Sequence, residues 1–127
     1  QFGFTADESP DFLPHRYEAN TVAYTGTHDN ETTAGWFEGL DSATRERVLD
    51  YFDSSPAQIV RAMIRSLIAS VADTVIFPMQ DVLDLGNEAR MNHPGTTGNN
   101  WQWRATEAQF TEEAASWLAH LCRLYER

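Results

Sequence analysis

The chain has 127 residues, of which 9 are basic and 19 acidic, and its formal net charge is −10. This charge argues against nucleic acid or an anionic membrane as a partner, and no apolar run approaches the roughly 20 residues of a membrane span. With a single cysteine no internal disulfide can form, a usage that fits a reducing, cytoplasmic compartment.

The first elements expected in chain order are two strands. Residues 1–4 have strand character but begin abruptly, without a cap or linker, as expected for a piece of a longer chain. A long polar loop with two prolines follows, and the apolar residues 21–25 predict the second strand. Helices are then expected over residues 32–38, over 42–52 and, from Ser55-Pro56 onwards, up to about residue 73.

Residues 74–79 predict a third strand, whose continuously apolar character is typical of a parallel strand covered on both faces. A long loop rich in glycine and asparagine comes next, and a last helix is expected over residues 111–125. Strands that alternate with helices favour an α/β fold with parallel strands.

The most informative segment is TGTHDNETT at residues 25–33, directly after the second expected strand. The carboxyl ends of parallel strands are where α/β proteins place their chemistry, so His28 and Asp29 are candidate site residues. The alternative is that Asp29 and Asn30 only cap the following helix. Spacing alone leaves both interpretations open.

Several blocks together resemble the 4-α-glucanotransferases, also called amylomaltases or disproportionating enzymes. Residues 24–36 resemble that family's block at the seventh barrel strand, residues 77–95 the eighth-strand block, and NWQWR at 100–104 the motif after it. Residues 1–4 and 13–15 resemble the sixth-strand region. The resemblance implies that residues 1–127 are a single fragment of a TIM-type (β/α)8 barrel, namely its last three βα units, incomplete on its own.

The activity that the resemblance implies is retaining transfer of α-1,4-glucan segments between maltooligosaccharides, without a cofactor. Retaining chemistry uses two carboxylates about 5–5.5 Å apart. The family's nucleophile and acid/base belong to the fourth and fifth strands, upstream of Gln1, so the isolated chain is expected to be inactive. It is also expected to depend on the missing amino-terminal part of the barrel, or to self-associate through open sheet edges.

The resemblance also implies site residues. Asp29 matches a third carboxylate that favours the oxocarbenium-like transition state, and His28 matches a residue that hydrogen-bonds the same sugar, the alternative being a satisfied strand-end histidine. Asn92 matches a substrate-binding asparagine, and Phe2 an aromatic residue on the acceptor side, unless it is a core residue. Gln80 is expected at the carboxyl end of the last strand.

For some residues in the matched blocks, the sequence allows both a structural and a sugar-binding role. Asp81 is expected to be structural, as a cap or a partner of Arg90, rather than to touch sugar. Trp101 and Trp103 could offer stacking faces, but tryptophans close to a final helix are more often packing anchors. Glu31 stands where the family more often has aspartate, which keeps the charge.

Three further hypotheses remain. The chain could be a non-catalytic α-glucan-binding module that uses Trp36, Trp101 and Trp103, or a self-sufficient interaction protein with a small α/β fold. A metal hydrolase is the third, although its candidate ligands lack any compact ligand spacing. These candidate ligands are His15, His28, Asp29 and His93.

Overall fold

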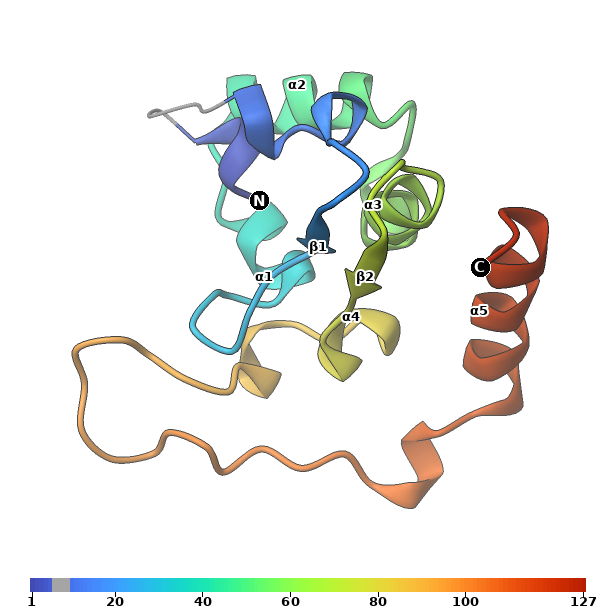
Figure 1. The fold of residues 1–127 in the computed structure, drawn as a ribbon. Coiled ribbons are helices and arrows are strands. Elements are labelled where there is room, and N and C mark those ends of the chain that lie inside the picture. Colours follow the sequence, from blue (N-terminus) through green and yellow to red (C-terminus); the bar gives the residue numbers. More distant parts are fainter. Residues whose placement is uncertain (6–9) are drawn as a thin grey trace.

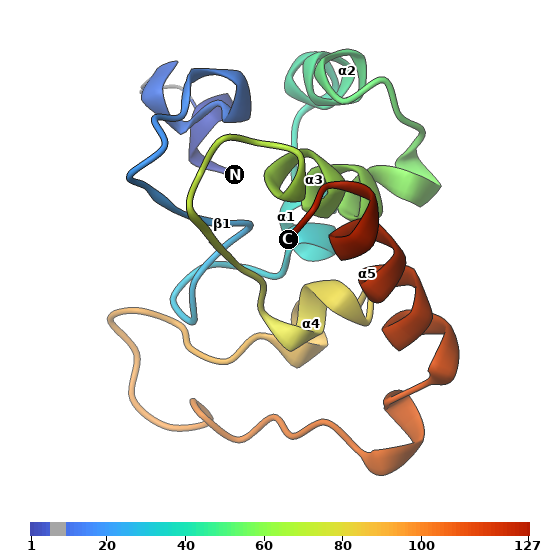
Figure 2. The same ribbon diagram turned by 45° about the vertical axis from the view of Figure 1, so that its right-hand side comes forward.

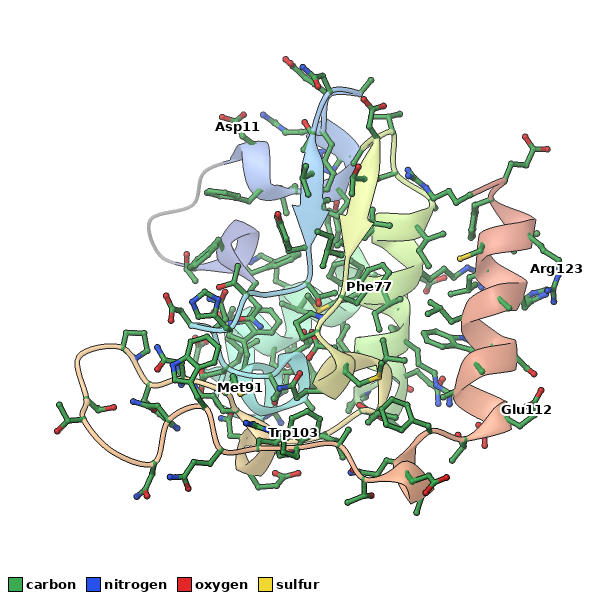
Figure 3. The ribbon with its side chains drawn as sticks, turned by 60° about the horizontal axis from the view of Figure 1, so that its bottom comes forward. Asp11, Phe77, Met91, Trp103, Glu112 and Arg123 are labelled. Atoms are coloured by element: carbon green, nitrogen blue, oxygen red, sulfur yellow. The ribbon has the colours of Figure 1, made fainter. Side chains whose placement is uncertain are left out.

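The computed structural model describes residues 1–5 and 10–127 (Figure 1). Its sheet has two short strands, β1 (Val22–Tyr24) and β2 (Thr74–Ile76), which pair in parallel with Val22 opposite Thr74. Figure 3 shows both arrowheads pointing toward the end of the molecule where Met91 lies. The predicted parallel arrangement of the second and third expected strands is confirmed.

Helices make up most of the remaining regular structure. The α-helices are α1 (Thr33–Glu38), α2 (Ser42–Tyr51), α3 (Ile59–Ile68), α4 (Met79–Val82) and α5 (Glu112–Leu124). The 3-10 helices are η1 (Phe2–Phe4), η2 (Pro10–Phe12), η3 (Pro14–Arg16), η4 (Pro56–Gln58), η5 (Asn87–Ala89) and η6 (Glu107–Gln109). Within the described ranges, none of these helices has the length and apolar character to cross a membrane.

Three of the α-helices begin with a side-chain cap. The hydroxyls of Thr32 and Thr111 and the carboxylate of Asp41 accept hydrogen bonds from backbone N–H groups in the first turns of α1, α5 and α2. Such caps satisfy amides that have no partner within the helix. The predicted start of each of these helices is therefore confirmed to within one residue.

The strand predicted at residues 1–4 is wrong. Phe2–Phe4 forms a 3-10 turn, in which Phe4 N donates to the Gln1 carbonyl at 3.1 Å and Thr5 N to the Phe2 carbonyl at 3.4 Å. The described residues pair no strand with this segment, so its backbone groups are satisfied by local bonds instead of a ladder. A run this short does not carry enough periodicity to separate the two outcomes.

The third expected strand and the helix before it are shorter than predicted. β2 ends at Ile76 rather than at residue 79, because Pro78 has no N–H to donate and instead precedes the first turn of α4. Gln80 and Asp81 consequently lie in a helix rather than at a strand end. α3 likewise ends at Ile68, and residues 69–73 form the turn into β2.

The core lies between α3 and the elements around it. Ile64, Ile68 and Val48 are fully or almost fully buried, and the side chain of Leu121 on α5 joins them. Figure 2 shows α5 running beside α3. At the carboxyl terminus, Arg127 Nε donates to the Ile68 carbonyl at 2.7 Å. Trp36 is also buried here, with 7% of its surface exposed, so its suggested role in binding glucan is wrong.

The sheet is covered on one face only. Ala23 is buried against Leu67 of α3, whereas Val22, Tyr24 and Ile76 are 48%, 44% and 47% exposed on the opposite face. The expectation that both faces of the third expected strand, here β2, are covered is therefore not met within the described residues. An apolar surface of this kind requires another layer to remove it from water.

Shortening Ile64 to valine is expected to lower the free energy of unfolding by about 1 kcal/mol, because one buried methylene is lost from a close-packed site. Urea denaturation followed by circular dichroism measures this change. Val71→Ala removes more atoms from a side chain that is 61% exposed, and should stay within about 0.5 kcal/mol of the unsubstituted protein. Equal losses in the two variants would contradict the position of the core.

Candidate functional site

The candidate site lies at the carboxyl ends of the two parallel strands. Loop 25–32 follows β1, and the segment through Phe77 and Pro78 leads from β2 into α4 (Figure 3). A cavity of about 540 Å³ opens between them. Its lining includes Tyr24, His28, Gln80, Arg90, Met91 and Trp101.

Loop 25–32 is shaped by its own polar side chains. The Asn30 Oδ1 atom accepts hydrogen bonds from the backbone N–H and the hydroxyl of Thr27, at 2.8 and 3.0 Å. Thr32, not Asp29 or Asn30, caps α1 by accepting a bond from Gly35 N at 3.1 Å. The interpretation of Asp29 and Asn30 as helix caps is therefore wrong, and the Asp29 carboxylate takes no part in the start of α1.

Asp29 instead meets two polar side chains. The Asn92 Nδ2 atom donates to Asp29 Oδ1 at 2.7 Å, and His28 Nε2 lies 3.3 Å from the same oxygen. The side chains of His28 and Asp29 are 55% and 51% exposed, so this group is open to solvent and to a ligand. The carboxylate, the amide and the imidazole together offer both donors and acceptors to hydroxyl groups.

A buried carboxylate, next in the chain to the cavity-lining Gln80, connects three elements. Asp81 is 2% exposed and accepts hydrogen bonds from the hydroxyl of Thr25 and from both the hydroxyl and the backbone N–H of Thr33. These contacts join α4 to the end of β1 and to the start of α1. Asp81 is thus structural, as predicted, but its predicted pairing with Arg90 is replaced by the two threonines.

The two remaining predicted site residues lie in different places. Gln80 lines the cavity but is largely buried, and its Nε2 atom donates to the Ala89 carbonyl at 3.1 Å. Phe2 lines a separate hollow of about 580 Å³ beside β1. It is 53% exposed, with its ring 5.7 Å from that of Phe12, so the alternative that Phe2 is a core residue is wrong.

The structure decides between the two interpretations of Trp101, a stacking face for sugar or a packing anchor. It is 51% exposed, lines the cavity, and has its ring centre 5.0 Å from that of His28. Its backbone φ of 64° lies in the left-handed region, a conformation that costs a residue other than glycine on the order of 1–3 kcal/mol. A bond from Trp101 N to the Met91 carbonyl at 2.7 Å supports this backbone, so Trp101 presents its ring instead of anchoring the final helix.

The candidate metal ligands are dispersed. His15 Nδ1 lies 2.8 Å from the Tyr51 hydroxyl, and the His93 amide donates to the Asn100 side chain in the loop after α4. Among the residues that the structure describes, no three His, Cys, Asp or Glu side chains are grouped so that they could hold a metal ion.

Three comparisons with known proteins are consistent with one another. A family model described as 4-alpha-glucanotransferase matches residues 1–113. The 4-alpha-glucanotransferase of Clostridium butyricum is 48% identical over all of this chain, which covers 26% of that protein. The enzyme of the same name from Streptococcus pneumoniae is 43% identical, with the same coverage.

The fold is similar to that of a solved structure. The amylomaltase from Streptococcus agalactiae in complex with acarbose superposes with a TM-score of 0.86 and is 41% identical in sequence. The match covers 91% of this chain and 23% of that one. The chain thus spans about a quarter of the length of the relatives that it matches.

Proposed function

Because this chain belongs to the 4-alpha-glucanotransferase family, we propose that it supplies the carboxyl-terminal part of an enzyme that transfers α-1,4-glucan segments between maltooligosaccharides. It would form the carboxyl-terminal part of a TIM-type (β/α)8 barrel, with β1 and β2 as two of its strands, whereas residues 1–4, the first of the three expected strands, form a 3-10 turn. The coverage of about a quarter of each relative supports this proposal. The glucan-like acarbose bound to the amylomaltase neighbour supports an α-glucan as the ligand.

The uncovered face of the sheet fits a barrel that continues beyond this chain. Val22, Tyr24 and Ile76 would point into the barrel interior, where side chains of alternate strands fill the core. The free edges of β1 and β2 would pair with neighbouring strands. The isolated chain, with edges and face bare, is then expected to self-associate or to bind the missing part.

Asp29 carries the proposal. Its carboxylate stands at the strand ends, half exposed, with the Asn92 amide at 2.7 Å and the His28 imidazole at 3.3 Å. A negative charge held there would stabilise the positive charge that develops on the donor sugar in an oxocarbenium-like transition state. His28 and Asn92 would bind hydroxyls of the same sugar, and Trp101 would offer its exposed ring to a neighbouring one.

The other predicted residues would act around this centre. Phe2 would line the acceptor side from its own hollow, next to the loop that carries His28 and Asp29. Gln80 would shape the cavity floor, because its amide nitrogen already donates to the Ala89 carbonyl. The nucleophile and the acid/base of a retaining mechanism would come from the part of the barrel that precedes residue 1 in the relatives.

Disproportionation of maltotriose tests this function. The full-length protein is expected to convert maltotriose into glucose and longer oligosaccharides. Residues 1–127 alone should form none, because the nucleophile and the acid/base would lie in the missing part of the barrel. Chromatography of the products measures both reactions. Transfer by the isolated chain would contradict the assignment of those two carboxylates to the missing part.

The exposed ring of Trp101 beside the cavity favours one alternative, an α-glucan-binding module without catalysis. Titration with maltoheptaose, monitored by tryptophan fluorescence, distinguishes this binding module from the transferase when it is combined with the maltotriose assay. Saturable binding by a full-length protein that turns over no maltotriose would support the binding module and exclude the transferase.

A further inference from the structure

Arg90 follows η5 directly and begins the segment that carries Asn92. Its Nη2 atom donates to the Asp29 carbonyl at 2.8 Å and its Nε atom to the Asn92 carbonyl at 2.9 Å. Thus one guanidinium binds the backbones of the two residues whose side chains share the 2.7 Å hydrogen bond. Asp29 and Asn92 come from different loops, so this double contact joins the two sides of the site.

The guanidinium is itself held in place. The side chain of Arg90 is 17% exposed, and its Nη1 atom lies 4.0 Å from Glu31 Oε1. That carboxylate oxygen also accepts a bond from Asn87 Nδ2 at 2.8 Å. Asn87 lies against Gly35 of α1, where a Cβ atom would overlap its side chain. The charge of Arg90 therefore faces a carboxylate that is itself hydrogen-bonded to Asn87.

The planar shape of the guanidinium explains why an arginine, rather than a lysine, suits position 90. A guanidinium is a rigid plane whose donors point in set directions, so two carbonyls bound to it keep a defined separation and angle. An ammonium group lacks that geometry and can rotate about its stem. Both hydrogen bonds that Arg90 donates go to backbone carbonyls, so they act on the position of the loops.

We propose that Arg90 is a positioning residue, which sets the orientation of the Asp29 carboxylate toward the reacting sugar by fixing the Asp29 and Asn92 backbones in one plane. This inference rests on the proposed function. A positioning role predicts that loss of Arg90 lowers kcat more than it raises KM, because the transition-state contact is misplaced while most substrate contacts remain.

The test uses the full-length protein with maltotriose as substrate. Arg90→Gln is expected to lower kcat by about 100-fold, the cost of a displacement near 1 Å, with KM changed much less. Arg90→Lys, which keeps the charge, should fall between this variant and the unsubstituted protein. Added methylguanidinium should restore part of the kcat of Arg90→Ala, since it supplies the missing planar donor. Arg123→Gln, on the outer surface of α5 (Figure 3), is the matched control and should leave both constants unchanged.

Two kinetic outcomes would overturn the inference. A rise in KM with kcat unchanged would mean that Arg90 binds sugar directly. Equal values of kcat and KM in Arg90→Gln and Arg123→Gln would mean that Arg90 neither positions Asp29 nor binds sugar. Should Arg90→Gln fail to fold, the kinetics of Arg90→Lys decide by the same criteria.

A structural measurement separates this inference from the proposed function. If the unsubstituted full-length protein transfers no glucan, the proposed function fails, and crystal structures of Arg90→Gln and Arg90→Lys then decide the role of Arg90. Loss of the hydrogen bond between Asn92 Nδ2 and Asp29 Oδ1 supports a positioning role. Retention of that bond at its 2.7 Å length overturns it.

Discussion

Asp29→Asn in the full-length protein is expected to lower kcat for maltotriose disproportionation by roughly 10³-fold, with a small effect on KM. Asparagine has nearly the same shape, so the loop and much of the contact with Asn92 should survive. What is lost is the negative charge beside the donor sugar, and that charge matters most when positive charge develops in the transition state. Steady-state kinetics of glucose release measures the effect.

A matched control separates this loss from a general effect of removing a charge. Asp50 is an exposed residue of α2, a helix that lies away from the carboxyl ends of the strands (Figure 1). Asp50→Asn makes the same chemical change and should leave kcat unchanged. Circular dichroism confirms that both variants fold. A decrease of less than tenfold for Asp29→Asn would exclude Asp29 as the carboxylate that stabilises the transition state.

Asp81→Ala is expected to lower the free energy of unfolding by about 3 kcal/mol, the second large effect. The side chain is 2% exposed and accepts three hydrogen bonds from Thr25 and Thr33. Alanine would leave these donors buried without an acceptor, and both ends of loop 25–32 would lose their link to α4. Disproportionation of maltotriose, the proposed activity of the full-length protein, is expected to slow as well, because this loop carries His28 and Asp29.

Asp81→Asn provides the internal comparison. Its carbonyl oxygen can still accept one bond and the threonine hydroxyls can rotate to accept from its amide, so the loss of stability should be smaller than for alanine. Asp50→Ala, at an exposed position, should change stability by no more than about 0.5 kcal/mol. Urea denaturation of the three variants measures their free energies of unfolding and so ranks the losses of stability. A loss for Asp81→Ala equal to that for Asp50→Ala would contradict the buried network.

Helices whose caps and apolar periodicity involve residues close together in the chain could be predicted from the sequence. The caps at Asp41 and Thr111 and the apolar periodicity of α3 act within one or two helical turns, so the residues that form each element lie close together in the chain. The strand prediction for residues 1–4 is wrong because strand formation does not depend on neighbouring residues alone. A strand is stabilised by pairing with a distant segment, and the described residues hold no partner for this one.

The sequence alone determined the parallel α/β arrangement, the family resemblance and the identity of His28, Asp29 and Asn92 as candidates, since each of these depends on residue type and order. Only the tertiary structure decided that Thr32 rather than Asp29 caps α1, that Asp81 binds two threonines, and that Trp101 faces His28. It also showed that Arg90 joins the two loops. The physical reason is that hydrogen bonds and ring contacts depend on distance in space, and parallel strands bring their carboxyl ends together whatever length of chain lies between them.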